Sequence, residues 1–446
     1  MRKLAIMMWL AGVAWAAEPL SLREAVQKAL VGNPAMQAGA EGVKAAAARA
    51  EAARGNRLPR ADYSESWTRS DNPVYVFGSL LEQRQFTASD FSLGFLNYPP
   101  FLNNFQSRIA VQQNIWDGGL RGARERAASL GRDAAHEGAR GVEIMVIAQA
   151  IGAYYDAELA REAVKVADDA VKSTQADLKR AQDRRSAGLA TDADVLSIRV
   201  HQASAQEELI RRKADAELAM ARLATVMGAQ VDSQYDLTTP LQAAKSIVMA
   251  PETEAESDAE KNRPEVRLAL IQSSIRDTQV RAAKAAMLPQ FFIEGMFEAD
   301  RQEFFNKGGA NWTIAAGMRW NLFNGFSDTH EREAARHDAL QARANERQAA
   351  AAVRVEAKRA WLETQSAQQQ LEVAGTATSM AEESLRIIRN RYAAGLADVT
   401  DLLHAETALV EAKTNSLRAA RDQRLAAVAV EAAKGTLNRD SEVVNQ

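Results

Sequence analysis

The sequence has 446 residues, of which only 6% are aromatic, and alanine is abundant. This length allows two or three ordinary domains, and the composition favours long, closely packed helices over one thick core. The formal net charge of -3 provides no strong basic field, which argues against nucleic acid as a partner. Because the chain has no cysteine, disulfides, a thiolate nucleophile and a lipidated cysteine anchor are also excluded.

Residues 1–16 have the pattern of a secretory signal peptide. Arg2 and Lys3 precede an apolar run, and the small residues Ala14 and Ala16 are set for cleavage. The alternative is a buried first helix, which the flanking charge and the small-residue exit disfavour. The apolar run is too short to cross a membrane. The rest of the chain has no apolar run near the roughly 18 residues of a membrane helix, so any membrane crossing would use β-strands.

Two stretches in the first half alternate apolar and polar residues, as strands do. They lie at about residues 60–70, where Tyr63 and Trp67 share one face, and at about 106–117. Residues 71–105 between them are rich in aromatic residues, Asn and Pro. We interpret this intervening segment as an outer loop.

The segment from Gly118 to Ser186 predicts one very long helix. It contains no proline, and apolar residues recur three and four positions apart as a heptad seam. About 69 residues at ~1.5 Å each would make a helix on the order of 100 Å long. So narrow an apolar seam has to be buried against neighbouring helices. The seam comprises Val164, Ala167, Val171, Thr174, Leu178 and Ala181.

The motif AGL ends the long helix at Gly188 and occurs again at Gly395. A glycine at this point is typical of a helix C-terminus, and Thr191 or Asp398 shortly afterwards is typical of a new N-cap. Each motif therefore predicts the tip of a helical hairpin, followed by a return helix.

The second half of the chain repeats the first. NIWDGG at residues 114–119 matches NLFNGF at 321–326 with the same shift that relates the two tip glycines, which indicates an internal duplication. Alternating strands are predicted at about 290–299 and 311–323. A second long helix keeps the same seam, with Leu371, Ala374, Thr378, Ala381, Leu385, Ile388 and Tyr392 as its members.

These elements organise the chain after the signal peptide into four parts. Residues 17–228 form a first structural repeat of a helix, two strands, a long helix, a tip and a return helix. Residues 229–262 form an equatorial segment, residues 263–435 a second structural repeat, and residues 436–446 a C-terminal tail.

Strands of about 9 to 11 residues with one apolar face fit either a membrane β-barrel or a soluble layer packed on helices. Four of them, in a chain with a signal peptide and two very long helices, favour the barrel. Four strands cannot close a barrel, so several chains would have to contribute.

The order of these elements resembles that of the outer membrane efflux proteins, the TolC-like outer membrane factors. The resemblance rests on the opening LSLREAVQKALVGNPAMQA, the LPR and LPQ turns, the NIWDGG and NLFNGF strand exits and the doubled AGL tip. It implies a mostly α fold with membrane β-structure: a trimeric twelve-stranded β-barrel, four strands per chain, continued by a long antiparallel α-helical barrel. The implied location is the outer membrane, in contact with its lipid, with the helical tube in the periplasm.

The same resemblance implies a passive exit duct of a tripartite efflux or type I secretion system. The implied partners are two further copies of the chain, a periplasmic adaptor and an inner-membrane transporter. Drug efflux, metal efflux and type I protein secretion all remain open.

Two sets of site residues follow from the resemblance. The adaptor-contacting tips are Gly188, Leu189, Ala190, Thr191, Gly395, Leu396 and Ala397. The periplasmic constriction and gate are Asp401, His404, Asp194 and Tyr392. The family carries a second acidic residue where this chain has His404, and a latch arginine where it has Ala397, so the charge ring and the latch differ here. Three Asp401 side chains converging on one axis would repel one another and favour a bound cation.

Other classes of function have little support. The five histidines are scattered, and the sequence has neither an HExxH motif nor a glycine-rich phosphate loop, so we expect no enzyme, metal site or cofactor. The alternative function is a periplasmic coiled-coil scaffold or adaptor without a membrane barrel. Such a protein would be soluble and nearly all helical.

Overall fold

The structure is a computed structural model that describes residues 18–241, 251–306 and 308–445. The predicted signal peptide and residues 242–250 of the predicted equatorial segment lie outside the described residues. The chain is mostly helical with one four-stranded sheet, as expected, and divides into two compact units. We call them the helical unit (Met1–Gly42, Glu137–Leu268 and Arg347–Gln446) and the sheet unit (Val43–His136 and Ala269–Glu346).

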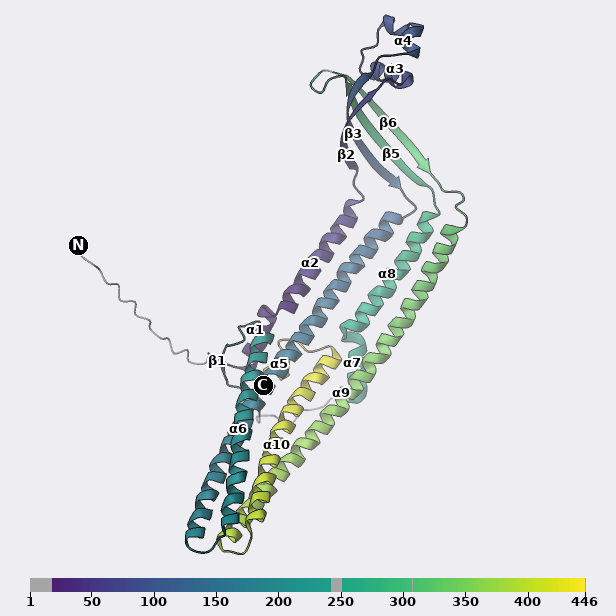
Figure 1. Ribbon diagram of the computed structural model, residues 1–446. Helices are drawn as coiled ribbons and strands as arrows, with labels where there is room; N and C mark the ends of the chain where they lie inside the picture. The colour runs from purple at the N-terminus through teal and green to yellow at the C-terminus, as the bar shows by residue number, and fades with distance from the viewer. Residues whose placement is uncertain (1–17, 242–250, 307, 446) are drawn as a thin grey trace, which may run out of the picture. The chain divides into compact units, whose positions relative to one another are not determined.

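The elements are labelled in Figure 1. The helices are α1 (Leu22–Gly32), α2 (Pro34–Gly55), α3 (Pro73–Glu82), α4 (Leu93–Asn97), α5 (Leu120–Ser186), α6 (Asp192–Val226), α7 (Glu252–Asn262), α8 (Pro264–Ala286), α9 (Ser327–Ala393) and α10 (Val399–Lys434). The strands are β1 (Glu18–Leu20), β2 (Arg60–Ser70), β3 (Leu102–Trp116), β4 (Tyr235–Leu237), β5 (Gln290–Arg301) and β6 (Gly309–Arg319). Short 3-10 helices occupy Ala88–Phe91 and Glu442–Val444.

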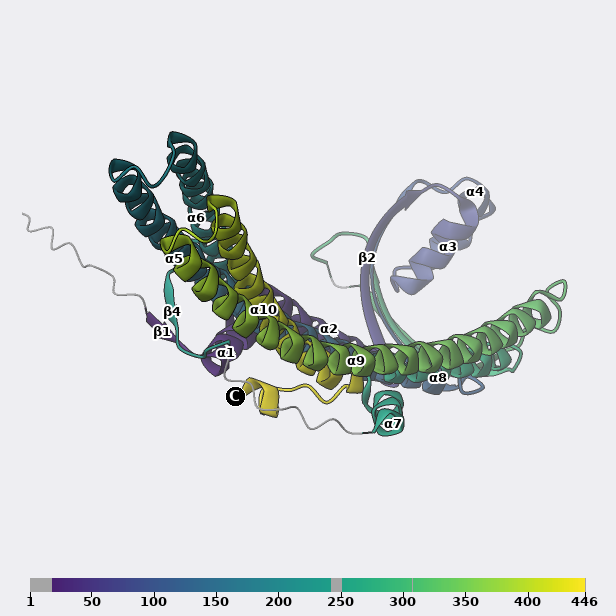
Figure 2. The same cartoon turned by 90° about the horizontal axis from the view of Figure 1, so that it is seen from below.

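The two predicted long helices are α5 and α9, which have 67 residues each. Every predicted seam residue on them is buried or half-buried. In the helical unit α6 returns beside α5 and α10 beside α9, which covers the seams (Figures 1 and 2). In the described ranges, none of the helices combines the length and the apolar character that crossing a membrane requires.

The core of the helical unit is centred on α5. Tyr154 is fully buried, and its hydroxyl donates to the carbonyl of Leu20 at 3.0 Å and accepts from the N–H of Thr239 at 2.8 Å. These bonds hold β1 and β4, which pair in parallel. Leu437 and Val444 of the C-terminal tail join the same core. Segments far apart in the sequence therefore meet on the middle of α5.

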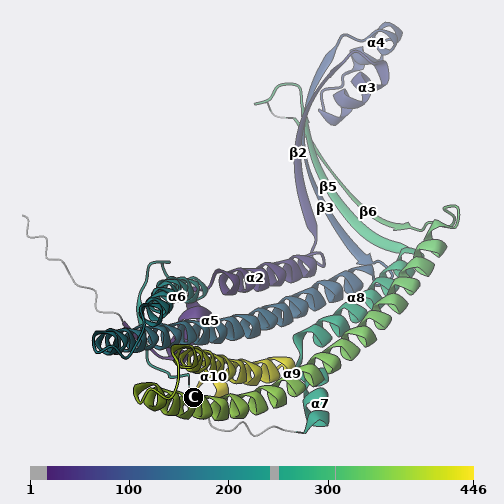
Figure 3. The same ribbon diagram turned by 60° about the horizontal axis from the view of Figure 1, so that its bottom comes forward.

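The sheet unit contains one antiparallel sheet with strand order β2-β3-β5-β6 (Figure 3). Its register places Tyr63, Ile109, Phe297 and Trp312 opposite one another in a single row across all four strands. This is the apolar face that the alternation predicts. Trp312 is 73% exposed, because none of the residues that the structure describes covers its side chain.

The connection between β2 and β3 is more ordered than the predicted outer loop. It contains α3, α4 and a 3-10 helix, and its last residues belong to β3. Asn72 caps α3 and Pro73 occupies its first turn, while Val76 packs against Leu102 in a small apolar cluster. The description of 71–105 as a loop was therefore wrong in part, because its aromatic residues pack locally into a cluster of their own.

Candidate functional site at the hairpin tips

Both hairpin tips are formed by a glycine in the left-handed backbone conformation. Gly188 has φ +78° and Gly395 has φ +76°, a region that only glycine adopts readily. At the first tip the N–H of Leu189 donates to the Arg184 carbonyl at 2.8 Å; at the second, Leu396 donates to the Arg391 carbonyl at 2.8 Å. The two tips are therefore structurally equivalent, and Figure 1 shows them near each other.

Each tip exposes one leucine. Leu189 is 67% exposed and Leu396 is 69% exposed, while Ala190 and Ala397 are half-buried beside them. Beneath the tips, an apolar cluster that includes Val195, Ile198, Leu385, Tyr392 and Leu402 joins the two hairpins. Each tip thus presents a free apolar side chain on a firmly packed base.

The return helices begin at side-chain caps. Thr191 caps α6, and the Asp194 carboxylate accepts from the Thr191 N–H at 2.8 Å and from its hydroxyl at 2.9 Å. Asp398 caps α10 and accepts from the Asp401 N–H at 2.8 Å. Each cap stands three residues after its glycine, which explains locally why a new helix starts at the next residue.

Asp194 and Tyr392, the predicted latch partners, do not bond to each other within the described chain. The Asp194 carboxylate already accepts two hydrogen bonds from Thr191 in the cap of α6. Tyr392 is buried and its hydroxyl has no hydrogen-bond partner among the described residues. Burial raises the pKa of Tyr392, and Arg184, whose guanidinium lies 5.1 Å from the ring centroid, opposes that rise. The latch role of this pair remains a prediction.

Arg184 connects the two tips, a role that was not predicted from the sequence. Its guanidinium donates to the carbonyls of Tyr392 at 2.9 Å and Ala393 at 2.8 Å, so the end of α5 is tied to the end of α9. The duplication carried the signal: the shift that relates the two tip glycines also places Arg184 on Arg391, which bonds to the Leu396 carbonyl at 3.2 Å.

The predicted constriction residues Asp401 and His404 both lie on the exposed face of α10. No ion pair joins them in the portion of the chain that the structure describes. A single chain therefore leaves both side chains open to solvent or to another copy, and their place at a constriction remains a prediction.

A buried polar cluster lies further along the hairpins and joins four helices. Glu406 of α10 accepts from the Ser173 hydroxyl of α5 at 2.9 Å and from Arg389 of α9 at 2.9 Å. His201 of α6 lies 3.5 Å from the same carboxylate, and Asp177 of α5 lies 3.4 Å from the Arg389 guanidinium. We call these five residues the inter-hairpin cluster. A cavity of about 370 Å³ adjoins it.

The two carboxyl groups of the inter-hairpin cluster differ strongly in their affinity for protons. Burial and the neighbouring Glu406 raise the pKa of Asp177 to about 6. Burial alone would raise the pKa of Glu406, but hydrogen bonds from His201, Asp177, Ser173 and Arg389 lower it to about 2. In mildly acidic conditions the pair therefore holds one proton, which resides on Asp177.

Within the described residues, no group of three or more His, Asp or Glu side chains is arranged to hold a metal ion. Most polar side chains of the inter-hairpin cluster bond to one another, and the caps at the tips bond to backbone. The tips and the inter-hairpin cluster therefore form a packed contact between helices that includes several charged side chains.

Comparison with known proteins identifies the architecture. The sequence profile described as "Outer membrane efflux protein" matches residues 25–229 and 256–436. This chain belongs to that family. It is an outer membrane exit channel for efflux or secretion, with a helical tube in the periplasm. Members of the family are trimeric channels that work with adaptors and inner-membrane transporters, and they are not enzymes.

Individual relatives are distant but cover much of the chain. The chain is 26% identical to Protein CyaE of Bordetella pertussis over 96% of its own length and 88% of that protein. It is 24% identical to outer membrane protein OprJ of Pseudomonas aeruginosa, over 68% of this chain and 60% of OprJ. The crystal structure of CusC superposes with a TM-score of 0.80 at 17% identity, covering 93% of this chain and 92% of CusC.

Proposed function

We propose that three copies of this chain form one duct that receives substrate from an inner-membrane transporter through a periplasmic adaptor docked on the hairpin tips. The observation that carries the proposal is the pair of equivalent tips, each with an exposed leucine beside a bare glycine backbone. An exposed apolar side chain next to accessible backbone suits the apolar face of a partner helix.

The edges of the sheet support assembly of several copies. β2 and β6 are the outermost strands, and their unpaired backbone groups could not stay unsatisfied in lipid. Pairing β6 of one copy with β2 of the next satisfies both edges and turns the exposed apolar face toward outer membrane lipid. Three copies would supply twelve strands, a number within the range of closed membrane barrels.

We expect the protein purified in detergent to have the mass of three chains, because only closure satisfies the sheet edges. Sedimentation or light scattering, with the detergent contribution subtracted, measures this mass. A monomer that stays soluble without detergent would instead support the periplasmic scaffold.

We further propose that Asp401 and His404 line the narrow periplasmic end of the duct, with Tyr392 and Asp194 nearby as gate residues. Both constriction side chains are exposed on α10 and free to face the axis. Three carboxylates in a confined channel focus the electric field and concentrate cations there.

Asp401→Ala should therefore weaken block by a multivalent cation by about tenfold or more, since focusing of this kind changes local ion concentration by 10–10³. Conductance of the purified channel in a planar bilayer, with the cation added on the periplasmic side, measures the block. Glu411→Ala is the matched control, because Glu411 is an exposed carboxylate further along the same helix. Equal block in wild type and Asp401→Ala would place the constriction elsewhere.

A further inference from the structure

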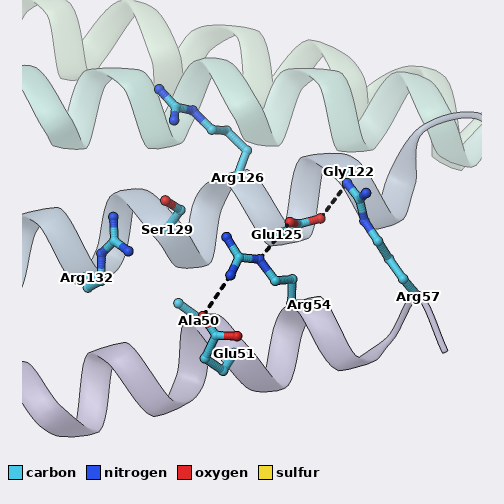
Figure 4. Close-up of a pocket in the computed structure, with 9 residues that line it drawn as sticks. All are labelled: Ala50, Glu51, Arg54, Arg57, Gly122, Glu125, Arg126, Ser129 and Arg132. Atoms are coloured by element: carbon cyan, nitrogen blue, oxygen red, sulfur yellow. Dashed lines mark hydrogen bonds and ion pairs between the residues drawn. The ribbon is translucent and has the colours of Figure 1, made fainter.

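A recess rich in arginine lies between α2 and α5 in the sheet unit (Figure 4). It has a volume of about 270 Å³. Four of the side chains that line it carry a guanidinium group and two carry a carboxylate. They are Arg54, Arg57, Arg126 and Arg132 with Glu51 and Glu125.

The carboxylates are too few to neutralise the arginines. Glu125 forms ion pairs with two of the arginines: its carboxylate oxygens lie 2.6 Å from the Arg57 guanidinium and 3.5 Å from the Arg54 guanidinium. Glu51 lies 2.9 Å from Arg54, which it therefore shares with Glu125. Figure 4 shows that the two contacts of Glu125 link the end of α2 and the turn after it to α5, whereas the Glu51–Arg54 contact lies within α2. Arg54 and Arg57 thus hold the two helices together while most of their N–H donors stay unused.

The other two arginines add positive charge without a carboxylate from the recess. Arg132 pairs with Asp133, its neighbour in sequence, which does not line the recess. Arg126 has neither a hydrogen-bond nor an ion-pair partner in the described part of the chain, and Figure 4 draws none for it. The recess therefore has a net positive charge and several free guanidinium donors, whose planar fork matches the oxygens of a phosphate group.

The recess lies next to the base of the sheet. Arg57 stands three residues before β2, and Arg126 follows the first turn of α5, about 9 Å along the helix axis from its start. At the same end of the sheet, Trp116 and Trp320 are half exposed, and the Trp320 indole N–H donates to the Met287 carbonyl at 3.1 Å. Exposed tryptophans of this kind mark the membrane–water boundary. Arg57 stands only three residues before β2, so it lies next to this boundary, where lipid headgroups are found.

We propose that this recess binds a phosphate group held by Arg54 and Arg57, and that the Arg126 side chain, which Figure 4 shows pointing away from α2, turns inward to join them. Nearness to the tryptophans makes a phospholipid headgroup one source of that group, and free phosphate in the periplasm is the other. The binding would be non-covalent and would strengthen the contact between α2 and α5 by placing an anion between their arginines.

Two measurements on the purified, full-length channel distinguish the sources. In the first, inorganic phosphate is titrated into the protein in phosphate-free neutral detergent and followed by calorimetry. In the second, the protein is mixed with micelles containing dioleoyl phosphatidylglycerol or dioleoylglycerol, which lacks phosphate, and the retained lipid is counted by native mass spectrometry.

Arg54→Gln and Arg126→Gln should each weaken binding about tenfold, since one charge-assisted hydrogen bond has roughly that effect. Arg124→Gln is the matched control, because Arg124 is exposed on the same helix but does not line the recess. The mass of the assembly, measured in parallel, shows that each variant folds. Arg126 makes no contact that folding depends on, so its variant keeps the test valid.

Retention of phosphatidylglycerol over dioleoylglycerol, lost in the two variants but not in the control, would support a lipid headgroup. Saturable binding of inorganic phosphate with the same dependence on Arg54 and Arg126, without any lipid preference, would support free phosphate. Absence of binding in both measurements, or equal binding by wild type, Arg54→Gln and Arg126→Gln, would overturn the proposal.

Discussion

Replacing Gly188 and Gly395 together by tryptophan should reduce export to background while leaving the assembled channel intact. A Cβ atom added to Gly188 would meet no atom within 4 Å, and one added to Gly395 would meet only the end of the Arg184 side chain at 3.8 Å. The indole rings would therefore point out of the tips, where the adaptor is proposed to dock, and would not disturb the core beneath.

The control for this experiment is the double alanine variant. Alanine shares the cost of the left-handed conformation, on the order of 1–2 kcal/mol per site, but adds a single carbon atom. Export by the alanine variant should therefore stay close to wild type. Efflux or secretion is measured in whole cells, with the mass of the extracted assembly as the folding check. Normal export by the tryptophan variant would show that the tips are not the docking surface. An equal loss in the alanine variant would assign the effect to backbone conformation.

Arg389→Met should separate the two hairpins near the tips. Arg389 lies between Asp177 and Glu406, whose side chains are 1% and 5% exposed. Removing it leaves two buried carboxyl groups without their shared cation, which typically costs on the order of 3–5 kcal/mol. Hydrogen exchange of the backbone amides in residues 385–410 measures the opening of this contact.

The same helix offers a matched control. Arg386 pairs with Glu383 on the surface, where both side chains are more than half exposed. Arg386→Met should therefore change exchange very little, because exposed ion pairs contribute roughly 0–1 kcal/mol. Adding Glu406→Gln to Arg389→Met should restore much of the protection by removing one buried charge. Protection in Arg389→Met equal to that in Arg386→Met would mean that the inter-hairpin cluster does not hold the hairpins together.

The pKa values of the inter-hairpin cluster define how this contact depends on pH. The folded-state pKa of Asp177, about 6, lies above its ordinary value of 3.8, so its contribution is full below pH 3.8 and is lost as pH rises through 6. The folded-state pKa of Glu406, about 2, lies below its ordinary value of 4.5, so its contribution is present above pH 4.5 and is lost as pH falls through 2. We therefore expect the hairpin contact in the wild-type protein to be stronger at pH 5 than at pH 7.

Several features of the fold follow from the sequence because their causes are local. The glycine of each AGL motif ends a helix because only glycine readily takes the left-handed conformation, and Thr191 and Asp398 restart it as caps. The heptad seams of α5 and α9 show which helix face is buried, since a narrow apolar stripe must be covered. Alternation in the strands likewise predicts the exposed row that includes Trp312, because successive strand residues point to opposite faces.

Other features depend on how distant segments align. A seam shows the buried face of a helix but not its axial position against a neighbour, because a slide by one heptad preserves the same pattern. Nothing in the sequence alone indicated that Asp177, Arg389 and Glu406, from three different helices, would meet in one buried cluster. The three-residue pairing of β1 with β4 is too short to leave a periodic signal, and it depends on the Tyr154 hydroxyl of a third segment. The sequence by itself determined the hairpins, the repeat and the membrane-type strands, because each has a local physical cause. The tertiary structure decided which charged groups share a buried space, because that depends on the relative axial positions of helices more than 200 residues apart.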